Sequence, residues 1–108
     1  MDSIIVSKNV LQEIVKDNKE NLVIVDLRGK QEYEQYHING AVNYSYDLLM
    51  KTYNFGENIM KNKQIIVYCE RGGRSIYAAR RLRALGYNAS SLLGGLENYL
   101  KNWKFTIS

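Results

Sequence analysis

The sequence predicts an α/β fold: a single three-layer domain over residues 1–108, with about five mainly parallel strands and helices on both faces. The apolar runs at residues 22–25 and 65–68 are continuous rather than alternating, which is typical of strands covered on both faces. Segments with apolar residues at helical spacing alternate with such runs, as in α/β domains. A length of 108 residues with 45% hydrophobic residues suits one domain around one core.

The expected strands are short apolar runs, most of them bounded by turn residues. They lie at residues 3–6, 22–25, 41–44, 65–68 and 89–93. The third follows the turn at Asn39-Gly40, and the fifth precedes the turn at Gly94-Gly95. Because ligands of open α/β sheets bind at the carboxyl ends of the strands, the residues just after strands are the first candidates for a site.

The expected helices show apolar residues at spacings of three and four. They lie at residues 8–18 after a cap at Ser7, 32–36, 46–62 with a break near 54–56, 74–85, and 96–103. In the helix at 74–85, Ser75, Ala78, Leu82 and Leu85 share one face, and Gly86 fits the C-terminal cap. We interpret the cluster Arg80, Arg81 and Arg83 as a solvated helix face rather than a nucleic-acid site.

The charge balance is mildly basic, with a net charge of +4 and a pI of about 9.2. That balance suits an anionic small molecule or an acidic partner and argues only weakly for nucleic acid. A single cysteine cannot form an internal disulfide, which favours a reducing compartment. The N-terminus lacks a basic leader, and no apolar stretch approaches 18 residues. We therefore expect a cytoplasmic monomer that binds neither nucleic acid nor membrane.

The only cysteine, Cys69, directly follows the strand at 65–68 and precedes a glycine-containing loop and a helix. Loop amides and the first turn of a helix together form a cradle for an anion. Arg71 and Arg74 add positive charge, which favours the thiolate and lowers the cysteine pKa. The stretch therefore indicates a nucleophilic sulfur that faces an anionic substrate, rather than a buried structural cysteine.

Each residue of the loop has an expected role beside Cys69. Gly72 and Gly73 allow close backbone approach and positive φ. Arg74 binds the donor anion or braces the loop, and Arg71 faces solvent and the incoming anion. Ser75 donates to the sulfur or simply packs on the strand, and Glu70 points away or tunes the choice of acceptor.

Residues 25–43 contain Asp26-Leu27-Arg28 and His37-Ile38-Asn39-Gly40-Ala41, and residues 68–75 contain Tyr68-Cys69-x-x-Gly72-x-Arg74-Ser75. These two motifs resemble the rhodanese homology domain. With Gly94-Gly95, the motifs span nearly the whole chain in the order and spacing of that family. The sequence departs from the family at Tyr36 (usually Gly), Asn39 (usually Pro) and Tyr99 (usually Trp, while the only Trp here is Trp103).

The resemblance implies a sulfurtransferase of the thiosulfate type. Cys69 would attack the outer sulfur of thiosulfate or a persulfide donor, carry a persulfide, and pass the sulfur to a thiol, cyanide or protein acceptor. The resemblance implies no metal and no organic cofactor. It also places His37 in a packing motif, hydrogen-bonded to backbone, rather than as a general base. We interpret Asp26 and Arg28 as a structural charge pair.

Other functions stay open at this point. A phosphatase or arsenate reductase also uses a Cys…Arg loop, but Cys69 and Arg74 enclose four residues, whereas phosphatases with such a loop enclose five. A shorter loop gives a smaller cradle, and arsenate reduction would lack a second cysteine. A non-catalytic interaction module is disfavoured because Cys69 is retained. A persulfide carrier that delivers sulfur to a partner protein would use the same chemistry.

Overall fold

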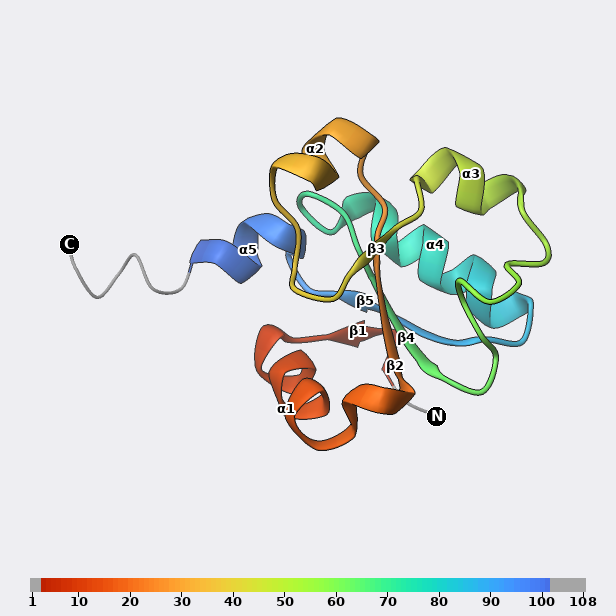
Figure 1. Cartoon of the computed structure of the whole chain (residues 1–108), viewed down its shortest axis with the longest axis horizontal. Helices are drawn as coiled ribbons and strands as arrows, with labels where there is room; N and C mark the ends of the chain where they lie inside the picture. The colour runs from red at the N-terminus through yellow and green to blue at the C-terminus, as the bar shows by residue number, and fades with distance from the viewer. Residues whose placement is uncertain (1–2, 102–108) are drawn as a thin grey trace.

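All five strands are parallel and form one sheet in the order β1-β5-β4-β2-β3 in the computed structural model, which describes residues 3–101 (Figure 1). The strands are β1 (Ile5–Val6), β2 (Leu22–Asp26), β3 (Val42–Asn43), β4 (Gln64–Tyr68) and β5 (Asn88–Leu92). The register pairs Asp26 with Tyr68, and Val67 with Ser91. The carboxyl ends of the three central strands therefore meet at one edge of the sheet, and the predicted fold class is confirmed.

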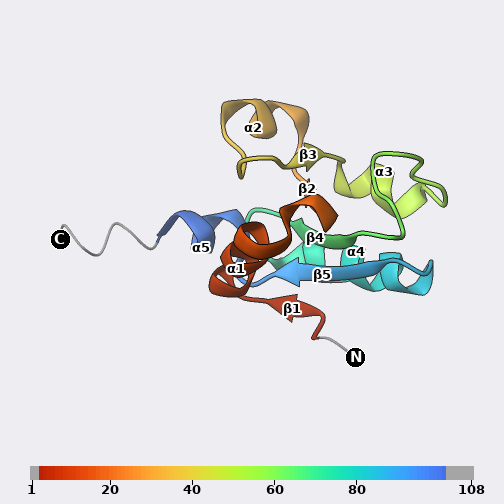
Figure 2. The same ribbon diagram turned by 60° about the horizontal axis from the view of Figure 1, so that its bottom comes forward.

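Helices cover both faces of the sheet (Figures 1 and 2). They are α1 (Lys8–Asn18), α2 (Lys30–Gln35), α3 (Tyr46–Lys51), α4 (Gly73–Ala84) and α5 (Gly95–Lys101), with a 3₁₀ turn η1 (Lys19–Asn21) after α1. Strand β4 divides its buried side chains between the two faces. Ile65 and Val67 join one core with residues of α3 and α4, while Ile66 and Tyr68 join a second core with residues of α1 and α5. Alternation along β4 thus explains why the run at residues 65–68 is apolar at every position.

The prediction of a long helix at residues 46–62 is wrong, because α3 ends at Lys51. The Thr52 hydroxyl donates to the carbonyl of Leu48 at 2.7 Å, and Asn54 Oδ1 accepts the amide of Gly56, which has φ +60°. Phe55 and Ile59 are buried. Their spacing of four imitates a helix, whereas they anchor an irregular loop to the core.

The cluster Arg80, Arg81 and Arg83 on α4 is only partly exposed, so within it the prediction of a solvated face holds for Arg80 alone. Arg81 and Arg83 are half-buried. Arg81 Nη2 donates to the carbonyl of Thr52 at 3.0 Å, and Arg83 Nε donates to the carbonyl of Ala89 at 2.6 Å. These two side chains therefore tie α4 to neighbouring backbone.

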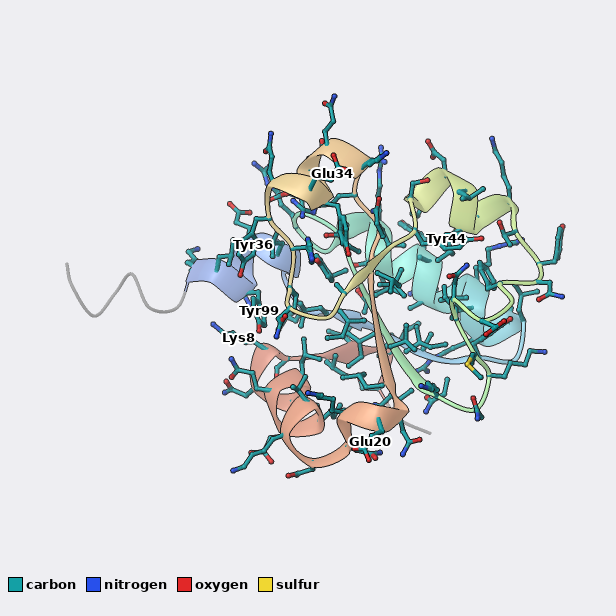
Figure 3. All side chains as sticks on the ribbon, in the orientation of Figure 1. Lys8, Glu20, Glu34, Tyr36, Tyr44 and Tyr99 are labelled. Carbon is teal, nitrogen blue, oxygen red and sulfur yellow. The ribbon has the colours of Figure 1, made fainter. Side chains whose placement is uncertain are left out.

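The last helix begins at Gly95 rather than at residue 96 and is described to Lys101, so Trp103 lies outside the described residues. Lys8 of α1 and Tyr99 of α5 lie side by side (Figure 3). Lys8 Nζ donates to the carbonyl of Tyr99 at 2.6 Å and lies 4.9 Å from the centre of its ring. This contact joins the helices at the two ends of the described chain. Within residues 3–101 no helix is both long and apolar enough to cross a membrane.

Candidate active site

The sulfur of Cys69 lies at the carboxyl end of β4, where the chain turns sharply into α4. Cys69 is 8% exposed. Gly72 has φ +93°, and its amide donates to Cys69 Sγ at 3.1 Å. A Cβ at Gly72 would lie 3.1 Å from the backbone nitrogen of Gly94, so both backbone conformation and space favour glycine here. Gly73 begins α4 without a positive φ, so the expectation of positive φ is confirmed only at Gly72.

Hydrogen-bond donors surround the sulfur. The Ser75 hydroxyl oxygen lies 3.5 Å from Cys69 Sγ. Burial alone raises the pKa of the Cys69 thiol, because it penalises the charged form. The Ser75 hydroxyl and the backbone amides of Ser75, Gly72 and Arg74 outweigh burial, so the pKa of Cys69 lies below its ordinary value. The arrangement therefore stabilises a thiolate that is largely removed from water.

Helix α5 holds the other side of this loop. The amides of Leu96 and Glu97 donate to the carbonyls of Cys69 and Glu70, both at 2.9 Å. Gly95 permits this approach, since a Cβ there would lie 2.5 Å from the Cys69 oxygen and 2.7 Å from the Glu70 oxygen. With these carbonyls engaged by α5, the loop amides remain free to face the sulfur. The sequence predicted only a turn at Gly94-Gly95, although the glycine pair itself was the signal of this close approach.

An open hollow of about 550 Å³ lies above the sulfur and is lined by Leu27, Arg28, Gly29, Glu32, Cys69, Glu70, Arg71, Gly73 and Arg74. Arg71 is largely exposed and lies 3.3 Å from Glu97. The Arg74 guanidinium lies 5.3 Å from the centre of the Tyr46 ring. Both arginines therefore bring positive charge to the hollow, Arg71 partly neutralised by its partner and Arg74 held against an aromatic face.

A buried charge network underlies the hollow on the side of β2. Asp26 is fully buried and accepts hydrogen bonds from Arg28 Nη2 at 2.9 Å and from the Tyr68 hydroxyl at 2.6 Å. Burial, then the bond to Asp26, raises the pKa of Tyr68 far above its ordinary value. Arg28 Nη1 also lies 3.4 Å from Glu70 Oε1. The structure thus shows the predicted Asp26–Arg28 pair and adds Tyr68, which the sequence indicated only as a strand residue.

His37 lies apart from the sulfur. Its Nδ1 is 2.7 Å from the carbonyl oxygen of Tyr33, and its ring stacks on the Tyr33 ring with centroids 3.8 Å apart. His37 is not among the described residues that line the hollow. The geometry therefore joins His37 to the α2 segment and not to Cys69.

Over residues 3–101, no group of three or more His, Cys, Asp or Glu side chains is placed to hold a metal ion. The groups at the sulfur and the hollow are a thiol, backbone amides, the Ser75 hydroxyl, three arginines and the carboxylates of Glu32 and Glu70. This set can stabilise anionic sulfur and bind an oxyanion.

The profile of the Rhodanese-like domain family matches residues 7–102. The thiosulfate sulfurtransferase GlpE of Coxiella burnetii is 35% identical over 88 residues, which cover 81% of this chain and 78% of that protein. A tRNA sulfurtransferase of Desulfurococcus amylolyticus is 38% identical over 77 residues, and the match covers 71% of this chain but only 14% of that protein.

Solved structures share the fold. The human single-domain sulfurtransferase TSTD1 superposes with a TM-score of 0.82 at 20% identity, with 94% of this chain and 98% of that chain covered. Since the family profile covers all but the ends of the sequence, this chain belongs to the rhodanese-like domain family, as a relative of its sulfurtransferases.

Proposed function

We propose that this protein moves sulfane sulfur from thiosulfate or a persulfide donor to a thiol, cyanide or protein acceptor through a persulfide on Cys69. The observation that carries the proposal is the buried sulfur of Cys69, which lies within reach of the Gly72 amide and the Ser75 hydroxyl. Donors placed around a position where negative charge resides stabilise that charge without reorganisation.

The first step is a nucleophilic displacement at sulfur. The Cys69 thiolate attacks the outer sulfur of thiosulfate, a new S–S bond forms, the old S–S bond breaks, and sulfite leaves with the electron pair. The persulfide on Cys69 keeps one negative charge, so the same donors serve the thiolate and the intermediate. No proton has to be removed once the thiolate exists, which agrees with a hollow whose described lining residues include no histidine.

The second step regenerates the enzyme. An acceptor thiolate or cyanide attacks the terminal sulfur, the S–S bond of the persulfide breaks, and the Cys69 thiolate leaves. Two displacements with a good nucleophile and a good leaving group replace one difficult transfer.

The charged side chains at the hollow have separate roles in binding the donor and the acceptor. We assign Arg74 to the donor anion, because no described carboxylate pairs with it. Arg71 attracts anions from solvent while it contacts Glu97. Glu70, held near Arg28, lies beside the entrance and selects acceptors by charge. A protein acceptor would make the chain a sulfur carrier, and a small acceptor would make it a thiosulfate sulfurtransferase.

Intact mass spectrometry tests the proposal. Incubation of the reduced protein with thiosulfate should add the mass of one sulfur atom, and cyanide or a thiol should then remove it. The Cys69→Ser variant is the matched control and should gain nothing. No gain in the wild-type protein, an equal gain in the variant, or turnover of an aryl phosphate at an enzymatic rate of about 1 per second or more would contradict the proposed chemistry.

A further inference from the structure

Ser91 of β5 is a buried polar residue that the chemistry above does not use. It is 2% exposed, and its Oγ lies 2.6 Å from Ser75 Oγ. Ser75 Oγ in turn lies 3.5 Å from Cys69 Sγ and 3.3 Å from the carbonyl oxygen of Gly72. A chain of three polar groups therefore runs from β5 through α4 to the sulfur.

The direction of the hydrogen bonds follows from the number of hydrogens. Each serine hydroxyl has one hydrogen to donate. Within residues 3–101, Ser75 Oγ is the only hydrogen-bond partner of Ser91 Oγ. A buried hydroxyl that donates to nothing is costly. Ser91 therefore donates to Ser75, and the hydrogen of Ser75 is free to point away from β5.

The hydrogen of Ser75 then has two acceptors, which differ with the state of Cys69. In the thiol form, the S–H donates to Ser75 Oγ and the Ser75 hydroxyl donates to the Gly72 carbonyl. When the thiol ionises, the sulfur becomes a charged acceptor, which attracts the hydrogen more strongly than a neutral carbonyl does. Ser91 can donate to Ser75 in both forms. The hydrogen of Ser75 is therefore never used in a bond to Ser91 and can turn toward the sulfur.

We propose that Ser91 is a positioning residue: its buried hydroxyl donates to Ser75 and thereby directs the Ser75 hydrogen to the anionic sulfur of Cys69. Within residues 3–101, Ser91 is not among the residues that line the hollow, and its hydroxyl bonds to Ser75 and not to the sulfur, so it acts only through Ser75. The effect of Ser91 on catalysis rests on the proposed sulfur transfer. The hydrogen-bond chain itself exists in the reduced protein and can be tested there without any sulfur transfer.

A double-mutant cycle on Ser75 and Ser91 tests this inference. The readout is the apparent pKa of Cys69 in the reduced protein, taken from the pH dependence of alkylation by iodoacetamide. Ser75→Ala should raise it by about one to two units, because a bond to a charged group is lost. Ser91→Ala should raise it by about 0.3 unit, since cooperative strengthening amounts to roughly 10–30% of a bond. In the Ser75→Ala background, Ser91→Ala should change nothing.

Ser90→Ala is the matched control. Ser90 lies next to Ser91 on the same strand, is 3% exposed, and donates to the carbonyl of Ser3. Its loss should lower stability and leave the pKa of Cys69 unchanged. The charged groups around the hollow are the same in all variants: Arg28, Glu32, Glu70, Arg71 and Arg74.

A second pair keeps the test decisive if Ser91→Ala folds poorly. Ser91→Thr adds a methyl group and retains the hydroxyl, whereas Ser91→Val adds the same methyl group and replaces the hydroxyl with a second one. Thr and Val therefore have similar sizes and differ in the hydroxyl, and both suit a strand. Thr should resemble the wild type and Val should raise the pKa of Cys69. Equal pKa values for Thr and Val, or an Ala effect that persists without the Ser75 hydroxyl, would overturn the inference. Because sulfur loading is not measured, failure of the proposed function would not imitate either result.

Discussion

Replacing Gly95 by alanine should damage both the stability of the domain and the reactivity of Cys69. Gly95 has φ +65°, and its new Cβ would lie 2.5 Å from the carbonyl oxygen of Cys69 and 2.7 Å from that of Glu70. Both contacts are with backbone, so neither can be relieved by rotating a side chain. The start of α5 must therefore move away from the loop that carries the sulfur.

The size of the effect can be separated into two parts. A left-handed conformation costs an alanine roughly 1–2 kcal/mol. Moving α5 also weakens the bonds from Leu96 and Glu97 to the carbonyls of Cys69 and Glu70, each worth about 0.5–1.5 kcal/mol. We expect Gly95→Ala to lower the free energy of unfolding by about 2–5 kcal/mol in total, from the sum of these terms.

Gly56→Ala isolates the first part, the conformational cost. Gly56 has φ +60°, and a Cβ there would have no atom within 4 Å. It should therefore show the conformational cost alone. Urea unfolding gives the two stabilities, and alkylation gives the pKa of Cys69, which should rise in Gly95→Ala because the loop amides shift, and stay constant in Gly56→Ala. Equal losses of stability together with an unchanged pKa in Gly95→Ala would refute the role of α5 as a brace.

Three further predictions concern the charged and aromatic groups. Arg74→Ala should raise the KM for thiosulfate about ten- to a hundredfold, since a charge-assisted bond is lost. Arg74→Lys should recover part of that loss, Arg71→Ala should change the KM little, and steady-state kinetics measure all three. Tyr68→Phe should cost about 1.5–3 kcal/mol in urea unfolding, because the buried carboxylate of Asp26 loses a donor. Because the pKa of Tyr68 is raised in the folded protein, its contribution to the free energy of unfolding is fully present below about pH 10 and is lost progressively as the pH rises further. Above about pH 10 the wild type should therefore lose about 1.4 kcal/mol of stability per pH unit through this group, and Tyr68→Phe should not. His37→Ala should lower the melting temperature while the rate per folded molecule stays within about tenfold, and a loss of about a hundredfold in a folded variant would mark His37 as a general base.

The sequence was sufficient for the sheet and the position of the sulfur, because these depend on local patterns. The runs at 22–25 and 65–68 are apolar on both faces, and Cys69 follows one of them with glycines close behind. The same reasoning failed at residues 52–62, where Phe55 and Ile59 imitate helical spacing while Asn54 and Gly56 form a turn.

Contacts between distant segments could not be predicted in this way. Ser91 and Ser75 are 16 residues apart, and Tyr68 and Asp26 are 42 apart, so only the packed sheet shows that they meet. Gly95 was visible as a turn residue, but its approach to the Cys69 loop depends on where α5 packs. Arg81 and Arg83 look solvated in a helical projection, although backbone carbonyls of neighbouring segments bind them.

The most direct test of the account compares Cys69 with itself in the folded and the urea-unfolded protein. It is the only cysteine in the chain, so the pH dependence of iodoacetamide alkylation reports on this thiol alone. The inward-facing amides and the Ser75 hydroxyl predict a lower apparent pKa in the folded state, and hence stability that is present above the unfolded pKa and lost as the pH falls through the folded one. A folded pKa equal to or above the unfolded value would contradict the claim that this loop is built to hold an anionic sulfur.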